Sequence, residues 1–126
     1  MDGEVRRDAT VSPLLRDAAR RGADYLAALE RRKVRPEAAA IAALARLERP
    51  LPHEPEDPAA VIAQLDELVA PATMATAGPR FFGFVIGGAL AAALAANWLA
   101  TAWDQNAAMD SVTPGVARVE AIALGR

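Results

Sequence analysis

The chain has 126 residues, a formal net charge of −2 and no Cys. This length suffices for one domain with a hydrophobic core, and a hydrophobic content of 53% argues against disorder. The slight negative charge provides no basic surface for nucleic acid, and the lack of Cys excludes disulfides, thiolate metal sites and Cys nucleophiles. No apolar segment follows the charged N-terminal residues, so we predict no secretory signal and a cytoplasmic location.

The N-terminal part predicts a flexible tail followed by two helices. Residues 1–11 are charged and lack periodicity, whereas Ser12-Pro13 provides an N-cap and a proline at the first helical position. Apolar residues at helical spacing then predict a helix that ends near Lys33, because Pro36 disfavours helical geometry at the preceding residue. A short second helix is expected up to Leu47, so residues 12–49 form the N-terminal helices.

A proline-rich linker follows at residues 50–57. Alternating Pro and acidic residues favour extended backbone there. His53, the only His, lies in this linker. A lone His can act as a base or a ligand, but it has no partner at motif spacing, so we expect an exposed loop residue. Asp57-Pro58 then repeats the helix-start signal, and we expect this helix to end at Pro71.

Residues 78–88, GPRFFGFVIGG, are the most unusual segment of the chain. They contain all three Phe and four of the eight Gly. The segment predicts either a short buried strand or an extended stretch over residues 81–86, broken by the two glycines that follow. A helix is expected from Leu90 to Trp103, with Trp98 in the core and Trp103 either in the core, in a pocket wall or at an interface.

The run from Phe81 to Trp103 carries no charged side chain, which raises the question of a membrane span. Its most frequent apolar residue is Ala, which is only weakly apolar. Two adjacent glycines interrupt the run, and Asn97 would lie within the hydrocarbon. We therefore expect no membrane span and no membrane partner.

The C-terminal part predicts one more helix, started by Thr113-Pro114. Residues 58–113 would thus hold a helix, the Gly/Phe-rich loop and the apolar helix. The last helix, residues 114–126, has no evident packing partner, which suggests an incomplete fold. The overall expectation is a mainly α chain with an extended Gly/Phe-rich loop.

No catalytic motif is present. The chain has no phosphate-binding loop followed by Lys and Ser or Thr, no HExxH zinc motif and no Ser in a nucleophile elbow. Its carboxylate pairs lie in the linker or on a solvated helix face. We therefore assign no catalytic residue and no metal ligand.

Three strings nevertheless resemble a known family. Residues 78–90 (GPRFFGFVIGGAL), 95–99 (AANWL) and 103–107 (WDQNA) are similar to the N-terminal region of group II pyridoxal-phosphate-dependent decarboxylases. These are relatives of aromatic-L-amino-acid decarboxylase, and the similarity is strongest to bacterial members. The resemblance extends from about residue 14 to the end of the chain.

The resemblance implies a dimerisation and substrate-pocket segment of a fold-type I enzyme. In the family, the N-terminal helices clasp the partner subunit of a homodimer, and the aromatic stretch lines the pocket of a small amino-acid substrate. By this resemblance, the substrate-binding residues are Phe84, Val85, Ile86 and Gly87, together with Asn106 and Ala108 at the pocket of the neighbouring subunit.

The chain also departs from the family. Ala92 stands where Pro is common, and residues 109–111 (MDS) replace a more apolar stretch, in which a buried Asp110 would be costly. The family's cofactor domain would lie beyond residue 126, and residues 114–126 would be its first helix, truncated. Lys33 and His53 match neither the Schiff-base Lys nor the ring-stacking His. We therefore expect no pyridoxal phosphate on this chain alone.

Two hypotheses follow from the sequence. In the first, the chain is an inactive fragment of a decarboxylase, completed by a homodimer or by a second chain that carries the cofactor domain. In the second, it is a free-standing helical module that self-associates through the surface of residues 81–103. The residues leave open whether the chain takes part in catalysis.

Overall fold

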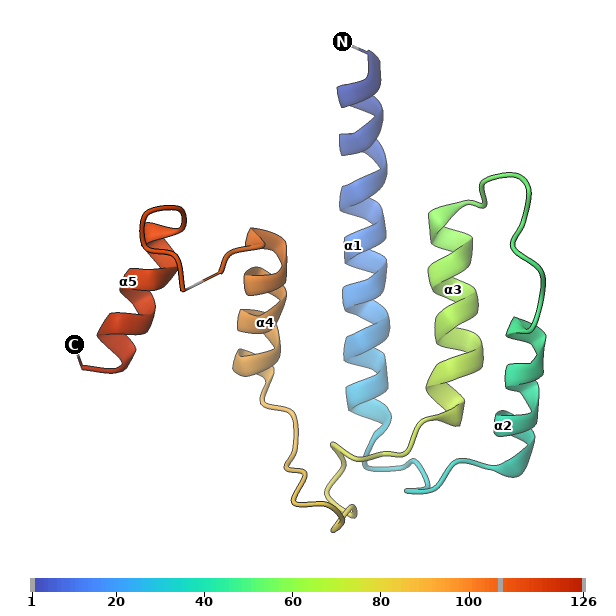
Figure 1. The fold of residues 1–126 in the computed structure, drawn as a ribbon. Helices are drawn as coiled ribbons and strands as arrows, with labels where there is room; N and C mark the ends of the chain where they lie inside the picture. Colours follow the sequence, from blue (N-terminus) through green and yellow to red (C-terminus); the bar gives the residue numbers. More distant parts are fainter. Residues whose placement is uncertain (1, 107, 126) are drawn as a thin grey trace. The chain divides into compact units, whose positions relative to one another are not determined.

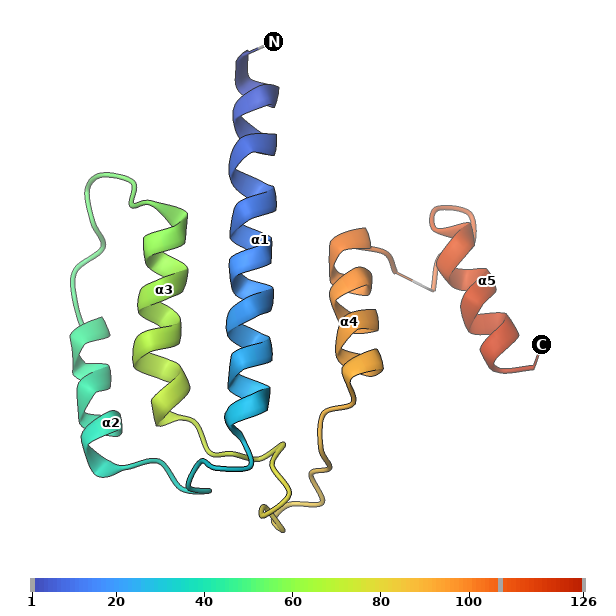
Figure 2. The same ribbon diagram turned by 180° about the vertical axis from the view of Figure 1, so that it is seen from behind.

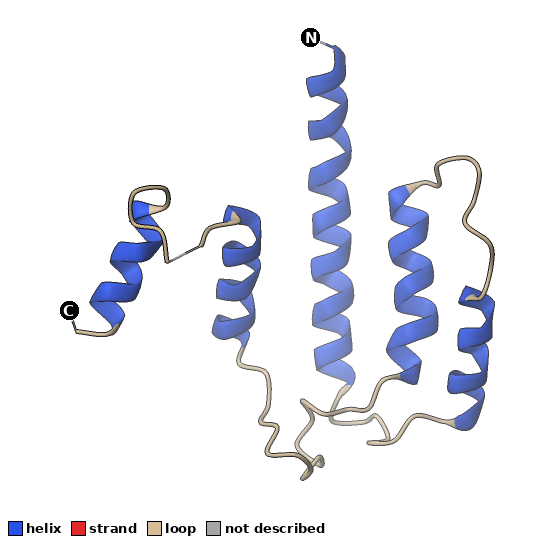
Figure 3. Ribbon diagram, viewed as in Figure 1, coloured by secondary structure: helices blue, strands red, loops and turns tan. Residues whose placement is uncertain are grey.

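The computed structural model describes residues 2–106 and 108–125. Over these residues the regular structure consists of five α-helices and two short 3-10 helices, without a strand, so the prediction of a mainly α chain is confirmed (Figure 3). The chain divides into two units, residues 1–88 and 89–126. Each unit is described by itself below.

The first unit consists of three α-helices side by side. These are α1 (Asp2–Ala28), α2 (Ala38–Ala43) and α3 (Pro58–Val69), with 3-10 turns η1 (Leu44–Leu47) and η2 (Ala70–Ala72) after α2 and α3. In both views α3 lies between α1 and α2, and α1 and α3 run in the same direction (Figures 1 and 2). Their C-terminal ends therefore lie at the same end of the unit.

The start of α1 differs from the prediction. The helix begins at Asp2, so the expected flexible tail is helical and Pro13 lies inside the helix. Proline fixes φ near −65°, which an α-helix tolerates, although the missing N–H removes one hydrogen bond. A Ser-Pro pair thus favours a helix start without excluding helical turns before it. The end also differs, because α1 stops at Ala28 and turns over residues 29–32 replace its expected last turn.

Most other local signals of the first unit are confirmed, although Pro71, expected to end the helix that starts at Pro58, lies inside η2. Helical structure spans residues 38–47, and the proline-rich linker contains no regular element, with His53 exposed in it. The carboxylate of Asp57 accepts a hydrogen bond from the Ala59 N–H at 3.2 Å and caps α3, with Pro58 in the first turn. This bond satisfies one of the free N–H groups at the helix start.

The hydrophobic core of this unit is small. Among residues 11–106 and 108–125, only Leu29, Leu68 and Ala75 are buried apolar residues. They come from the turn after α1, from α3 and from the loop after η2. The best-packed point of the unit is therefore the place where the chain turns into the Gly/Phe-rich loop.

The second unit contains α4 (Ala91–Trp103) and α5 (Pro114–Ala123). The α4 helix ends at Asp104 in the left-handed conformation, with φ 50°. Thr113 precedes α5 as predicted, but its hydroxyl does not cap the helix. It donates instead to the carbonyl of Asn106, the Met109 carbonyl lies 3.1 Å from the same hydroxyl oxygen, and Thr113 is 8% exposed. Thr113 thus closes the loop between the two helices.

Candidate functional site

The Gly/Phe-rich loop, residues 78–88, forms a tight turn at its tip. The expectation of a buried strand is wrong, because Phe84 and Val85 adopt φ 56° and 55° and reverse the chain. The Ile86 N–H donates to the Gly83 carbonyl at 3.2 Å across this turn. Two consecutive non-glycine residues in the left-handed region cost roughly 1–2 kcal/mol each. The tip is therefore strained, as is typical of functional segments.

The loop holds one aromatic side chain inward. The rings of Phe81 and Phe84 stack with centroids 6.4 Å apart and an interplanar angle of 29°. A Cβ at Gly83 would lie 2.9 Å from the tip of the Phe81 ring, so glycine gives this ring its space. Phe81 is half-buried as a result.

The remaining large side chains of the loop point into solvent. Phe82, Phe84 and Val85 are 94%, 86% and 105% exposed, and Ile86 is 47% exposed. Exposed apolar side chains are common singly, but a contiguous patch marks a surface for a partner or a ligand. Four such residues on one turn, with no charge among them, form an uncharged apolar surface here.

Asn106 and Ala108, the other two residues expected at the substrate, lie in the second unit. The side-chain oxygen of Asn106 accepts a hydrogen bond from the Ala108 N–H at 3.0 Å, and the main-chain carbonyl of Asn106 accepts one from Thr113. Both residues are exposed. Asp110 is exposed as well, so its charge is solvated and carries no burial cost.

The α4 helix presents an apolar surface over nearly its whole length. Every residue of α4 is exposed except Leu94, which is half-buried. Trp98, expected in the core, is 44% exposed, and Trp103 is 57% exposed. A helix that is uncharged on all sides is normally buried. Within its own unit, α4 therefore lacks the cover that its composition requires.

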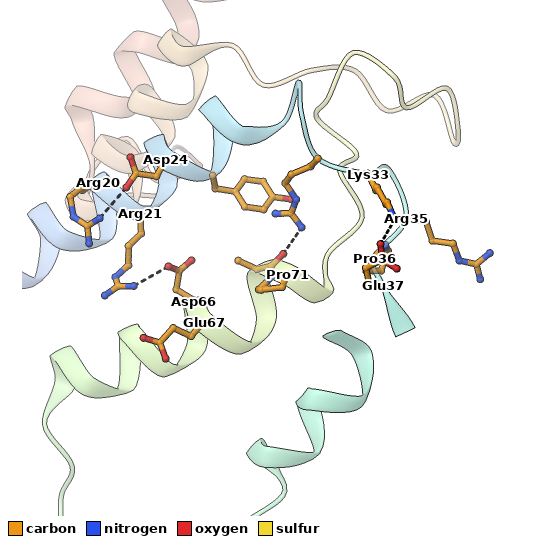
Figure 4. Close-up of a pocket in the computed structure, with 13 residues that line it drawn as sticks. Arg20, Arg21, Asp24, Lys33, Arg35, Pro36, Glu37, Asp66, Glu67 and Pro71 are labelled. Carbon is orange, nitrogen blue, oxygen red and sulfur yellow. Dashed lines mark hydrogen bonds and ion pairs between the residues drawn. The ribbon is translucent and has the colours of Figure 1, made fainter. Parts of the chain in front are cut away.

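A charged cleft between α1 and α3 is not predicted by the sequence. It encloses about 610 Å³, and the figure shows Arg20 directed at Asp24 and Arg21 at Asp66 (Figure 4). Arg21 donates to Asp17 at 2.6 Å and to Asp66 at 2.9 Å, linking α1 to α3. The spacing of the charges along α1 could have indicated the pairs within that helix. Nothing local indicates the bond to Asp66, 45 residues away.

The charges of this cleft act chiefly on one another. Hydrogen bonds from Arg21 and then Arg20 lower the pKa of Asp17 below its ordinary value of 3.8. The walls of the cleft carry both signs of charge, and each ion pair joins an Arg or Lys to an Asp or Glu. The Arg21–Asp66 pair joins α1 to α3, and we assign no ligand to the cleft.

The residues present do not fit pyridoxal phosphate. Lys33, the only Lys, is exposed and forms an ion pair with Glu37. The hydrogen bond to Glu37 raises the pKa of Lys33, whereas a Lys that attacks a carbonyl group needs a lowered pKa. His53 is exposed in the linker. The described residues also contain no group of three or more His, Cys, Asp or Glu side chains that could hold a metal ion.

No helix in the described part of the chain is long and apolar enough to cross a membrane. The uncharged run is divided between the loop and the 13 residues of α4, which is shorter than the roughly 20 residues that a span needs.

Comparison with known proteins gives no relative. No family model matches the chain, and neither a curated protein nor a solved structure matches it. Any assignment of function therefore rests on the residues of the loop, of α4 and of the segment that follows α4.

Proposed function

We propose that this chain supplies the dimerisation and substrate-pocket segment of a pyridoxal-phosphate-dependent amino-acid decarboxylase. The cofactor and its Lys would come from a cofactor domain outside these 126 residues, and the chain by itself would be inactive. The strings at residues 78–90 and 103–107 suggest this family, and the uncovered apolar surface of the loop carries the proposal.

The loop suits one wall of a pocket for an amino-acid side chain. Phe84, Val85 and Ile86 extend from a turn that has no polar side chain. Ligand pockets are lined mainly by apolar and aromatic residues, with few polar groups. An apolar wall binds the side chain of a substrate and excludes water, while polar groups elsewhere recognise its charged ends. In this arrangement, the loop binds the side chain of the substrate and excludes water from it.

The residues of this chain do not fit pyridoxal phosphate, and the proposal assigns the cofactor to another domain. When bound, the cofactor of such enzymes supplies the electron sink for loss of the carboxylate. A covering domain would shield the loop from water. This accounts for a segment with an apolar surface and no catalytic residue.

The alternative is a helical module that self-associates without catalysis. It is favoured by α4, on which Trp98, Leu99 and Trp103 are 44%, 53% and 57% exposed. A second copy of this chain would cover the α4 surface to the same extent as a cofactor domain. The alternative predicts a defined oligomer that melts cooperatively and has no dependence on any other domain.

A chimeric enzyme distinguishes the two. The chain would replace the N-terminal segment of a bacterial decarboxylase of this family, and carbon dioxide release would be followed with aromatic and aliphatic amino acids. We expect the chimera to decarboxylate one of these substrates, and the cofactor domain without the chain to be inactive. A dimeric chimera that binds the cofactor but shows no activity above that of the cofactor domain alone would contradict the proposal.

A further inference from the structure

The base of the Gly/Phe-rich loop is fixed at a junction with the end of α1. The junction contains the buried residues Leu29, Leu68 and Ala75, which are 6%, 4% and 2% exposed. The loop tip is strained and exposed, whereas its base emerges from the most closely packed part of the unit. The polar contacts around this base determine how the tip is held.

Thr73 is the first of three polar residues at the junction. Its hydroxyl donates to the Ala70 carbonyl at 2.8 Å. A Thr hydroxyl has a single hydrogen, so in the contact of 2.8 Å between Thr73 Oγ1 and the Tyr25 hydroxyl, Tyr25 is the donor. The oxygen of Thr73 therefore joins α1 to the turn that leads into the loop, and both hydroxyl groups are satisfied.

Arg32 binds the same turn from a second direction. Its guanidinium lies 4.7 Å from the centre of the Tyr25 ring, within the range of a cation–π contact. One terminal nitrogen donates to the Ala70 carbonyl at 2.7 Å and to the Thr73 carbonyl at 3.3 Å. The Arg32 carbonyl in turn accepts a hydrogen bond from the side chain of Arg80, inside the loop. Arg32 thus holds the chain both before and within the loop.

Main-chain hydrogen bonds connect the loop base with the aromatic residues of the loop. The Ala75 N–H donates to the Val34 carbonyl at 3.0 Å, and the Gly78 N–H donates to the Ala75 carbonyl at 3.0 Å. The Phe81 N–H then donates to the Gly78 carbonyl at 3.2 Å. A Cβ at Gly78 would lie 3.1 Å from the Ala75 carbonyl oxygen, so this path is closely packed. These bonds connect Ala75, two residues after Thr73, with the main chain of Phe81.

We propose that Tyr25, Arg32 and Thr73 form a positioning cluster that sets the orientation of the apolar loop. Only the consequence for a pocket wall rests on the proposed function, because the cluster acts on the loop itself. Their side-chain hydrogen bonds join them to one another and to the main chain of residues 70–74. They act on Phe84 and Val85 through the loop base and Phe81.

The three Phe residues provide a direct probe, because all of them lie in the loop. The full chain labelled with 4-fluorophenylalanine would give three ¹⁹F resonances, one each from Phe81, Phe82 and Phe84. Phe81 is half-buried, while Phe82 is 94% exposed, so their shifts should differ in the wild type. The spread of the three resonances measures the order of the loop without any enzymatic assay.

Four variants test the cluster. Thr73→Val removes the hydroxyl and Arg32→Lys removes the forked guanidinium, whereas Thr73→Ser keeps the hydroxyl. Thr101→Val is the matched control, because the Thr101 hydroxyl donates to the Asn97 carbonyl within α4. We expect Thr73→Val and Arg32→Lys to move the Phe81 and Phe84 resonances toward that of Phe82, with the helical circular dichroism unchanged. Thr73→Ser and Thr101→Val should keep the wild-type spectrum.

Each other outcome overturns the inference. Unchanged resonances in folded Thr73→Val and Arg32→Lys would show that the cluster does not position the loop. Equal shifts in Thr73→Ser and Thr73→Val would show that the hydroxyl is irrelevant. Loss of helix in both Thr73→Val and Arg32→Lys would make the cluster a determinant of the fold and not of the loop. None of these results bears on whether the chimeric enzyme is active, so the two proposals fail separately.

Discussion

Val85 combines a β-branched side chain with a left-handed backbone and complete exposure. Its φ is 55°, and its side chain makes no packing contact that substitution could remove, since it is 105% exposed. Glycine adopts this conformation without strain, but it also raises the entropy of the unfolded chain. The strain of roughly 1–2 kcal/mol exceeds the entropic cost of about 0.5–1 kcal/mol.

We therefore predict that Val85→Gly leaves the free energy of unfolding unchanged or raises it by up to about 1 kcal/mol. Phe82→Gly is the control, because Phe82 is 94% exposed in the same loop and has no positive φ. It should lower the free energy of unfolding by about 0.5–1 kcal/mol. Urea denaturation of both variants measures the difference. Equal destabilisation by the two substitutions would show that the turn at Val85 is not strained.

Asp17 makes the stability of the first unit sensitive to acid. Its carboxylate accepts hydrogen bonds from Arg21 and Arg20, both at 2.6 Å, and these lower its pKa below 3.8. A group whose pKa is lower in the folded state stabilises that state above its unfolded pKa and loses this contribution as the pH falls through the folded value. The contribution of Asp17 is therefore complete above about pH 3.8 and is lost below it.

Asp17→Asn should accordingly reduce the dependence of stability on pH below 3.8, while lowering stability at neutral pH. Glu30→Gln serves as the control, because Glu30 is exposed and has no ion-pair partner among residues 11–106 and 108–125. Thermal melts between pH 2 and 7 would compare the variants in dilute buffer, roughly at 10 mM salt, where screening is weak. If Asp17→Asn and wild type lose stability in parallel below pH 3.8, the bonds to Arg20 and Arg21 do not hold in solution.

At the scale of the helices, α1 and α3 differ in how they begin. Asp57 caps α3 through its carboxylate, whereas Ser12 lies inside α1. Asp57→Ala should lower the free energy of unfolding by about 1 kcal/mol. Ser12→Ala should leave it unchanged or raise it slightly, because Ala is the better helix former. If Ser12→Ala is as destabilising as Asp57→Ala, then α1 starts at Ser12 as the sequence alone suggests.

The sequence correctly predicts those elements whose signals come from residues adjacent in the chain. Asp57-Pro58 and Thr113-Pro114 both mark the start of a helix, and the proline-rich linker is irregular as expected. Capping and proline effects act within one turn of the chain, so one sequence is enough to reveal them.

The features that the sequence does not predict depend on contacts between distant residues or on rare conformations. The bond from Arg21 to Asp66 joins residues 45 apart, and the contact between Tyr25 and Thr73 joins residues 48 apart. A positive φ at Val85 contradicts the preference of its residue type. Of the candidate site, the sequence therefore reveals the apolar residues and not the way they are held.

At the scale of the whole molecule, the exposed apolar residues of the loop and of α4 should cause association of the isolated chain. Contiguous apolar surface favours self-association when no partner covers it. We expect the apparent mass in sedimentation velocity to rise with protein concentration, and Leu99→Glu to suppress this rise. Leu51→Glu is the control, because Leu51 is 91% exposed but lies in the linker. A chain that stays monomeric at all concentrations, or an equal effect of both substitutions, would contradict this expectation.

We propose that Phe84 belongs to the wall of a substrate pocket completed by a cofactor domain. The most direct test is kcat/KM of the chimeric decarboxylase with Phe84→Ala, compared with Leu51→Ala as a control that is equally apolar and exposed. Burial of a Phe side chain contributes about 1.5–3 kcal/mol. We therefore predict that Phe84→Ala lowers kcat/KM by about tenfold or more and that Leu51→Ala leaves it unchanged. Equal kcat/KM values for the two variants would contradict the assignment of the loop to the substrate pocket.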